Sequence, residues 1–183
     1  YVLSPETDDD YRLRVALDTT LDTETFNYTA QNTGKHQYTN TTMAATWSAA
    51  GLTTNSGNIT TTTTGLVVST YAMFPMIGAS QLYAETMVSF TAQPTANTII
   101  DFGFMVRGAA NPYTPADGAY FRLTSAGLFG VINSNGTETT TSVMSFSYTN
   151  NTVYQFIVAT HENDTEFWID GQLYGRLGGS ERG

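Results

Sequence analysis

The sequence contains no cysteine and only one lysine, Lys35. A chain without cysteine can form no disulfide, no thiolate zinc site and no cysteine nucleophile, so packing and hydrogen bonding have to supply its stability. Long apolar runs are also missing. None approaches the roughly 18 residues of a membrane-spanning helix, and no membrane partner is expected. The chain begins at Tyr1 without an initiator methionine or a signal pattern, which indicates a processed product or a segment of a longer protein.

Positive charge is scarce as well. Lys and Arg number 7 and Asp and Glu number 16, which gives a formal net charge of -9. Such a chain repels nucleic acid phosphates and anionic lipid surfaces, so no nucleic acid partner is expected. The length of 183 residues fits one domain with a sizeable core.

Threonine, tyrosine and phenylalanine are abundant, and these residues suit a pleated, half-buried sheet surface. The clearest alternation places Ile100, Phe102, Phe104 and Val106 on one face of a strand. Similar patterns predict strands near residues 24–30, 42–48, 65–74, 81–92, 97–107, 118–124, 127–133, 138–147, 152–160, 165–170 and 172–177. This number of strands favours an all-β fold with two stacked antiparallel sheets, a jelly-roll sandwich of the concanavalin type.

Turn signals separate these runs. They are Asn111-Pro112, the segment 115–118, Asn135-Gly136 and Asp170-Gly171. The Asp-Gly pair is the strongest of them and predicts a hairpin between residues 165–170 and 172–177.

The organisation predicted from these patterns is an N-terminal arm with an extended strand over 1–22, a jelly roll over 23–177 and a flexible tail over 178–183. The consecutive residues Asp8, Asp9 and Asp10 indicate a solvent-exposed arm, and calcium binding is the alternative interpretation. The strand within the arm alternates apolar with polar residues, its apolar positions being Tyr11, Leu13, Val15 and Leu17.

This strand suggests a mode of assembly. An open sheet edge exposes unpaired backbone groups, and an extended strand from another copy can pair with them; such donor-strand contacts build rings or filaments. Lysine on an edge strand commonly discourages pairing with another chain, and a chain with a single lysine has little of this protection. The alternative is that residues 11–17 pair within their own domain as an ordinary first strand.

Catalytic patterns are weak, and an enzyme is not expected. Glu162, Asp164 and Glu166 have the spacing that places carboxylates on one strand face, as glycoside hydrolysis in concanavalin-like sandwiches requires. The residues between them are polar, however, and the run falls where the chain should turn. His36 and His161 are far apart in sequence, so neither a metal site nor any cofactor is predicted.

A glycan is an alternative partner. Trp47, Tyr113 and Trp168 are candidates for stacking on a sugar ring, although Trp47 alternates with apolar residues as a core residue would. Calcium at a rim loop would use Asp101, Asp117 or Asp170. Six asparagines stand in Asn-x-Ser/Thr sequons and are candidates for N-glycosylation: Asn27, Asn40, Asn58, Asn135, Asn150 and Asn163.

Four stretches resemble structural proteins encoded by tailed phages and environmental viral sequences: YRLRV (11–15), FNYTAQNTGK (26–35), DGAYFRL (117–123) and EFWIDGQLYG (166–175). The resemblance covers nearly the whole chain and implies a concanavalin or laminin-G type jelly roll with a structural role. It brings no catalytic residues. It also implies a further C-terminal strand after a Pro/Gly-containing linker; the sequence stops at Gly183, so the alternatives are a real open edge and a truncation.

The sequence therefore predicts a non-catalytic structural subunit of an extracellular or virion-surface homopolymer, such as a filament, a fibre or a capsid or tail decoration. Donor-strand exchange of residues 11–17 is the predicted means of assembly, and the expected partner is another copy of the chain. A carbohydrate-binding adhesion module of a phage particle is the alternative.

Overall fold

The computed structural model describes residues 4–7, 13–16, 21–57, 61, 63–73 and 81–178. Within them the chain is all-β, as predicted, and every strand pair is antiparallel. None of these residues forms a helix with the length and apolar character that a bilayer crossing requires.

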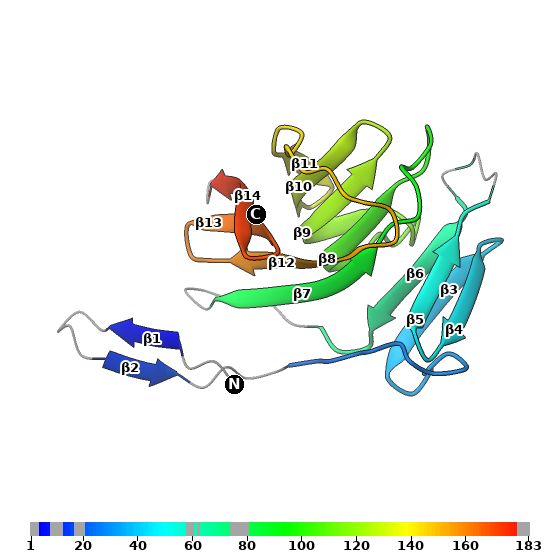
Figure 1. The fold of residues 1–183 in the computed structure, drawn as a ribbon, viewed down its shortest axis with the longest axis horizontal. Coiled ribbons are helices and arrows are strands. Elements are labelled where there is room, and N and C mark those ends of the chain that lie inside the picture. Colours follow the sequence, from blue (N-terminus) through cyan, green and yellow to red (C-terminus); the bar gives the residue numbers. More distant parts are fainter. Residues whose placement is uncertain are drawn as a thin grey trace.

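Two four-stranded sheets form the body (Figure 1). Sheet I has the order β11-β10-β9-β8, and its strands are β8 (Ile100–Arg107), β9 (Pro115–Thr124), β10 (Gly127–Ser134) and β11 (Thr137–Thr140). Sheet II has the order β14-β13-β12-β7, and its strands are β7 (Leu82–Ser89), β12 (Val153–Thr160), β13 (Asp164–Ile169) and β14 (Gln172–Gly178). The chain therefore begins sheet II with β7, completes sheet I, and returns to finish sheet II.

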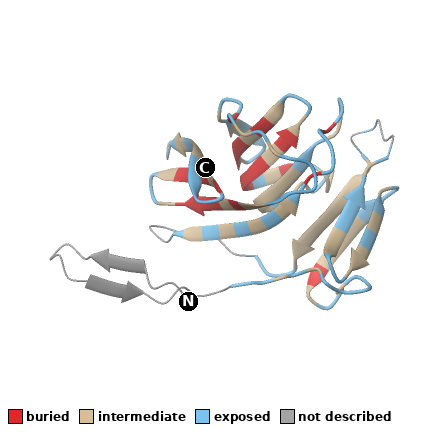
Figure 2. Cartoon of the chain, viewed as in Figure 1, coloured by how far each residue is buried: buried red, intermediate tan, exposed pale blue. Residues whose placement is uncertain are grey.

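The core lies between these two sheets. Phe121 of sheet I packs edge-on against Phe156 and Phe167 of sheet II, with ring centroids 5.2 and 5.3 Å apart. All three side chains are fully buried. Figure 2 shows the buried positions concentrated in β9 and β10 of sheet I and in β12 and β13 of sheet II. Large aromatic rings supply much of the apolar area that stabilises such a core. The arrangement is that of a β-sandwich, and its jelly-roll connectivity stays a prediction.

Three smaller ladders accompany the sandwich. β3 (His36–Thr41) pairs with β6 (Gly65–Thr70), β4 (Ala44–Ser48) pairs with β5 (Gly51–Asn55), and β1 (Ser4–Thr7) pairs with β2 (Leu13–Ala16). Figure 1 shows the β1–β2 hairpin lying apart from the sandwich. The predicted assembly strand thus pairs with a short strand inside the region expected to be a solvated arm. Asp8, Asp9, Asp10, Tyr11 and Leu17 lie outside the described residues.

Two predicted hairpin turns are confirmed. Asn135 and Gly136 have φ of 48° and 83°, and Asp170 and Gly171 have φ of 47° and 77°. Two consecutive positive φ values are the geometry of the type I′ turn, which matches the twist of the flanking strands. They join β10 to β11 and β13 to β14.

Several local predictions were wrong. Residues 24–30 form no strand, strands β3 and β5 were missed, and the run 138–147 is a strand only as far as Thr140. The turn predicted over 115–118 lies in β9, where Pro115 takes the strand's first position. The β8–β9 register shifts between Val106 and Arg107, which pair with Asp117 and Pro115, so Ala116 is the extra residue. Gly178 belongs to β14 and not to the predicted tail.

Candidate functional site

A large cleft runs beside the sandwich. It is lined along the whole of β8 and β6, by residues 82–87 of β7, by part of β3, and by residues 21–26. Its volume of about 3560 Å³ exceeds the roughly 300–1,000 Å³ typical of small-molecule pockets. The cleft therefore has the dimensions of a site for a polypeptide segment or another extended polymer.

The cleft borders two open sheet edges. Within the described residues, β7 and β8 each have a hydrogen-bonded neighbour on one side only, and both are 8 residues long. The opposite edges differ: β11 has 4 residues, and the pairing of β14 with β13 shifts register in its middle, whereas the register shift of β8 lies at its end, between Val106 and Arg107. Short or bulged edges resist strand addition, whereas long regular ones invite it. Neither β7 nor β8 contains proline or lysine.

Exposed apolar side chains gather in the same place. Of the twelve large hydrophobic residues that are exposed in the described part of the chain, eight line the cleft: Leu21, Tyr71, Met73, Tyr83, Met87, Ile99, Ile100 and Val106. Scattered single residues of this kind are ordinary, but exposed apolar residues that line one cleft are typical of an interaction surface. The period-two pattern of β8 was visible in the sequence; the concentration around one cleft was not.

The two walls of the cleft are tied together at one end. Arg107 at the end of β8 donates hydrogen bonds to Gln37 Oε1 at 2.6 Å and to Thr39 Oγ1 at 3.1 Å, both on β3. Nearby, the hydroxyls of Tyr113 and Thr41 are 2.6 Å apart. These contacts anchor the β3–β6 ladder to the sandwich.

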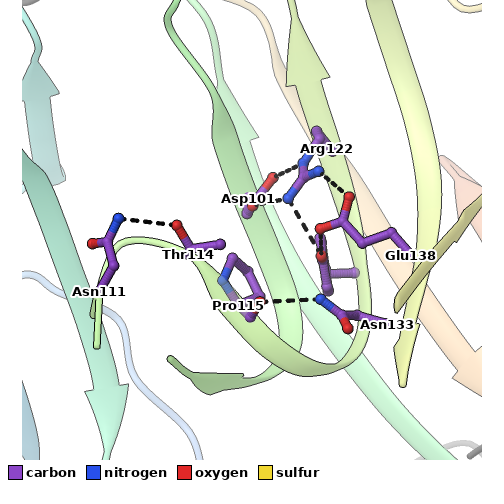
Figure 3. Close-up of polar contacts among 8 residues, drawn as sticks. Asp101, Asn111, Thr114, Pro115, Arg122, Asn133 and Glu138 are labelled. Carbon is purple, nitrogen blue, oxygen red and sulfur yellow. Dashed lines mark hydrogen bonds and ion pairs between the residues drawn. The ribbon is translucent and has the colours of Figure 1, made fainter. Parts of the chain in front are cut away.

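A charged cluster lies on the cleft side of sheet I (Figure 3). Arg122 of β9 donates from Nε and Nη2 to the two carboxylate oxygens of Asp101 on β8, at 2.9 and 2.8 Å, and from Nη1 to Glu138 Oε2 on β11, at 2.6 Å. The hydroxyl of Tyr120 donates to Glu138 Oε1 at 2.8 Å. The cluster therefore links three strands of sheet I.

Burial sets the electrostatics of this cluster. Desolvation raises the pKa of Asp101, and the hydrogen bonds and charge of Arg122 reduce that rise without cancelling it. The pKa of Tyr120 is raised by burial and by its hydrogen bond to Glu138. Its hydroxyl therefore remains a neutral donor, and Arg122 engages both carboxylates. This arrangement braces the sheet.

A second charged group sits where residues 21–26 enter the cleft. The imidazole of His36 is buried, with Nε2 3.4 Å from Asp22 Oδ2 and Nδ1 3.2 Å from Glu24 Oε2. Lys35 Nζ is 3.1 Å from Asp22 Oδ1. The ion pair between Lys35 and Asp22 thus holds this segment to the start of β3.

The carboxylates singled out in the sequence are not arranged as a catalytic strand. Glu162 is exposed before β13, so the run does turn there, but Asp164 and Glu166 lie within β13. His161, Asp164 and Glu166 come close enough for their ligand atoms to lie within 4.8 Å of one another. Arg176 forms ion pairs with both carboxylates, so a guanidinium already provides the charge that a cation would supply.

The three candidate sugar-stacking residues are not brought together. Trp47 on β4 packs edge-on against Tyr38, with centroids 5.7 Å apart. Tyr113 contacts Thr41. Trp168, on β13, donates from Nε1 to Glu166 Oε2 at 3.0 Å. Figure 1 shows β4 and β13 at opposite sides of the fold.

The remaining candidate residues are dispersed. Asp101 is engaged by Arg122, and Asp170 Oδ1 accepts a hydrogen bond from the Gln155 N–H at 2.8 Å. Asn58 lies outside the described residues. The other sequon asparagines are all exposed, as glycosylation would require: Asn27, Asn40, Asn135, Asn150 and Asn163.

Comparison with protein-family models, with curated proteins and with solved structures gave no match for this chain. Inference of function therefore rests on the geometry of the cleft and of the sheet edges.

Proposed function

We propose that the protein is a non-catalytic structural subunit of an extracellular or virion-surface homopolymer, assembled when the N-terminal strand of one copy adds to the sandwich of the next. The single observation that carries this proposal is the cleft, where most of the exposed large apolar side chains lie beside two long, open sheet edges. An exposed apolar surface of this kind promotes aggregation unless a partner covers it.

The N-terminal hairpin supports the same function. An isolated two-stranded ladder is at best marginally stable in water, because it buries little apolar surface. β1 and β2 form such a ladder outside the sandwich. Docking on another copy would supply the missing packing. Because the donating and accepting surfaces differ, each copy can give to one neighbour and receive from another, and the assembly grows as a ring or a filament.

Removing residues 1–20 tests the proposal. The core cluster spans residues 90–169 and uses none of the deleted residues, so the shortened chain is expected to fold. Size-exclusion chromatography with light scattering and electron microscopy should find polymers of the full chain and monomers of the deletion variant. Unchanged assembly after the deletion would rule out the donor-strand mechanism. A full chain that stays monomeric at all concentrations would rule out the structural role.

A carbohydrate-binding adhesion module is the second candidate. Trp168 and the exposed Tyr83 project from the same face of sheet II, since Trp168 pairs with Ile157 while Tyr83 pairs with Ala159. Aromatic faces on a flat sheet can stack on sugar rings. Glycan-array binding that disappears in Trp168→Ala favours this function. Trp47→Ala and Tyr113→Ala serve as comparisons, because those residues lie elsewhere.

A further inference from the structure

We infer that strand β8 and the cleft beside it are the acceptor site for residues 11–17 of a second copy of this chain. The inference rests on the proposed function and adds to it the surface that receives the strand. The donor would extend sheet I by pairing with the free edge of β8 and would place its apolar positions in the cleft.

The edge of β8 matches the donor in length. Seven extended residues span roughly 23 Å, and the 8 residues of β8 span about 26 Å, at about 3.3 Å per residue. All of β8 borders the cleft, so the edge is accessible along its length. The donor can therefore pair over its whole apolar pattern.

The apolar residues of the two strands are complementary. Phe102 and Phe104 of β8 pack against the core but are only half-buried, and Ile100 and Val106 at the two ends of the same row are exposed. In the donor's sequence, apolar residues occupy the alternating positions Tyr11, Leu13, Val15 and Leu17, which an extended strand would place on one face. Burying such side chains contributes about 25 cal/mol for each Å² of apolar area removed from water.

Charge favours this occupant over an arbitrary strand. The cleft is lined by six carboxylates and two arginines: Asp22, Glu24, Glu85, Asp101, Asp117 and Glu138, with Arg107 and Arg122. Arg122 already pairs with Asp101 and Glu138, and Lys35 pairs with Asp22, but the carboxylates still outnumber these cations, so the charge of the lining stays negative. The donor segment contains Arg12 and Arg14 and no acidic residue, in a chain that has only 7 Lys and Arg in total. A basic strand and an acidic cleft attract each other, and the attraction also selects the partner.

Two full-length variants separate donor from acceptor. Leu13→Asp with Val15→Asp disables the donor, and Ile100→Lys with Val106→Lys disables the acceptor by placing charge on its edge. Val143→Lys with Val153→Lys is the matched control, because those residues are similarly exposed and lie outside the cleft. Each variant alone should be monomeric, the control should polymerise, and an equimolar mixture of the two variants should give a dimer of twice the monomer mass.

The outcomes distinguish the two levels of the proposal. Polymerisation of the Ile100→Lys and Val106→Lys variant at the wild-type concentration would overturn β8 as the acceptor and leave a structural function standing. A wild-type chain that never assembles would overturn both. Circular dichroism and thermal unfolding verify that the acceptor variant is folded.

Cross-linking gives a readout that does not depend on edge charges. Because the chain has no cysteine, a single Val15→Cys copy mixed with an Ile100→Cys or Val106→Cys copy can form only the engineered heterologous disulfide or a symmetric one. Mild oxidation should yield covalent heterodimers with at least one of the β8 positions and none with Val153→Cys. Equal yields at Val153 would contradict the assignment.

Discussion

Arg107 at the end of β8 donates a hydrogen bond to Gln37 of β3, with Nη2 and Oε1 2.6 Å apart. These residues are 70 positions apart in sequence, and their contact joins two ladders that share no hydrogen-bonded strand among those the structure describes. It ties the two walls of the cleft together at the end of β8.

Substituting Arg107 should loosen the β3–β6 ladder without unfolding the sandwich. Arg107→Met keeps an apolar stem but loses two hydrogen bonds, each of which contributes about 1 kcal/mol. Hydrogen exchange should speed up in β3 and β6 and stay unchanged in β9 and β12. Arg107→Lys, which retains charge without the forked geometry, should have an intermediate effect. Uniform acceleration across all strands would contradict a local role.

The Arg122 cluster predicts a larger effect on global stability. Arg122→Met should lower the free energy of unfolding by about 3 kcal/mol, because it leaves the largely buried carboxylate of Asp101 without a partner. The double variant Arg122→Met with Asp101→Asn should recover part of the loss, since it removes the unpaired charge. Urea unfolding measures both. If the double variant is less stable than the single one, desolvation of Asp101 is not the cause.

Glu166 predicts a dependence of stability on pH. Burial opposes its ionisation, but hydrogen bonds from Arg176 and Trp168 outweigh burial and lower its pKa below the ordinary value of 4.5. As the pH falls below 4.5, the unfolded chain takes up the proton before the folded one does, so the stabilisation is present above this pH and is lost as the pH falls through the folded pKa.

Urea unfolding between pH 7 and pH 3 tests this sign. The free energy of unfolding should fall less steeply in Glu166→Gln than in the wild type on the acid side. Glu162→Gln is the matched control, because Glu162 is exposed before β13, and it should follow the wild-type curve. A Glu166→Gln curve parallel to the wild type over the whole range would refute the assignment.

Some features of the fold were predictable because they depend on a strand's own residues. The alternation over residues 100–106 correctly placed Phe102 and Phe104 toward the core, and the Asp170-Gly171 turn joined the strands expected. Strands β3 and β5 were missed because their polar, threonine-rich sequences carry no apolar alternation. They form by pairing with β6 and β4, which local sequence does not reveal.

The candidate site was predictable only in part. The strand in the N-terminal arm was recognised from its alternation, but its antiparallel pairing with Ser4–Thr7 was not. The carboxylates near Glu162 and the three candidate stacking residues were selected only because their side-chain types suit catalysis or sugar binding. The structure instead brings together Arg122, Asp101 and Glu138, which come from three strands whose proximity is a result of sheet formation.

The amino-acid composition and the period-two patterns by themselves determined that this chain forms antiparallel sheets without disulfides and which side chains face inward, because these properties follow from each residue's own size, polarity and position in a strand. Only the tertiary structure decided that β7 and β8 are edges and that exposed apolar residues meet beside them. A strand's neighbour is selected by packing between segments far apart in the chain, as β7 and β12 illustrate with Ser89 opposite Val153. An edge is therefore a property of the assembled sheets and not of the strand's sequence.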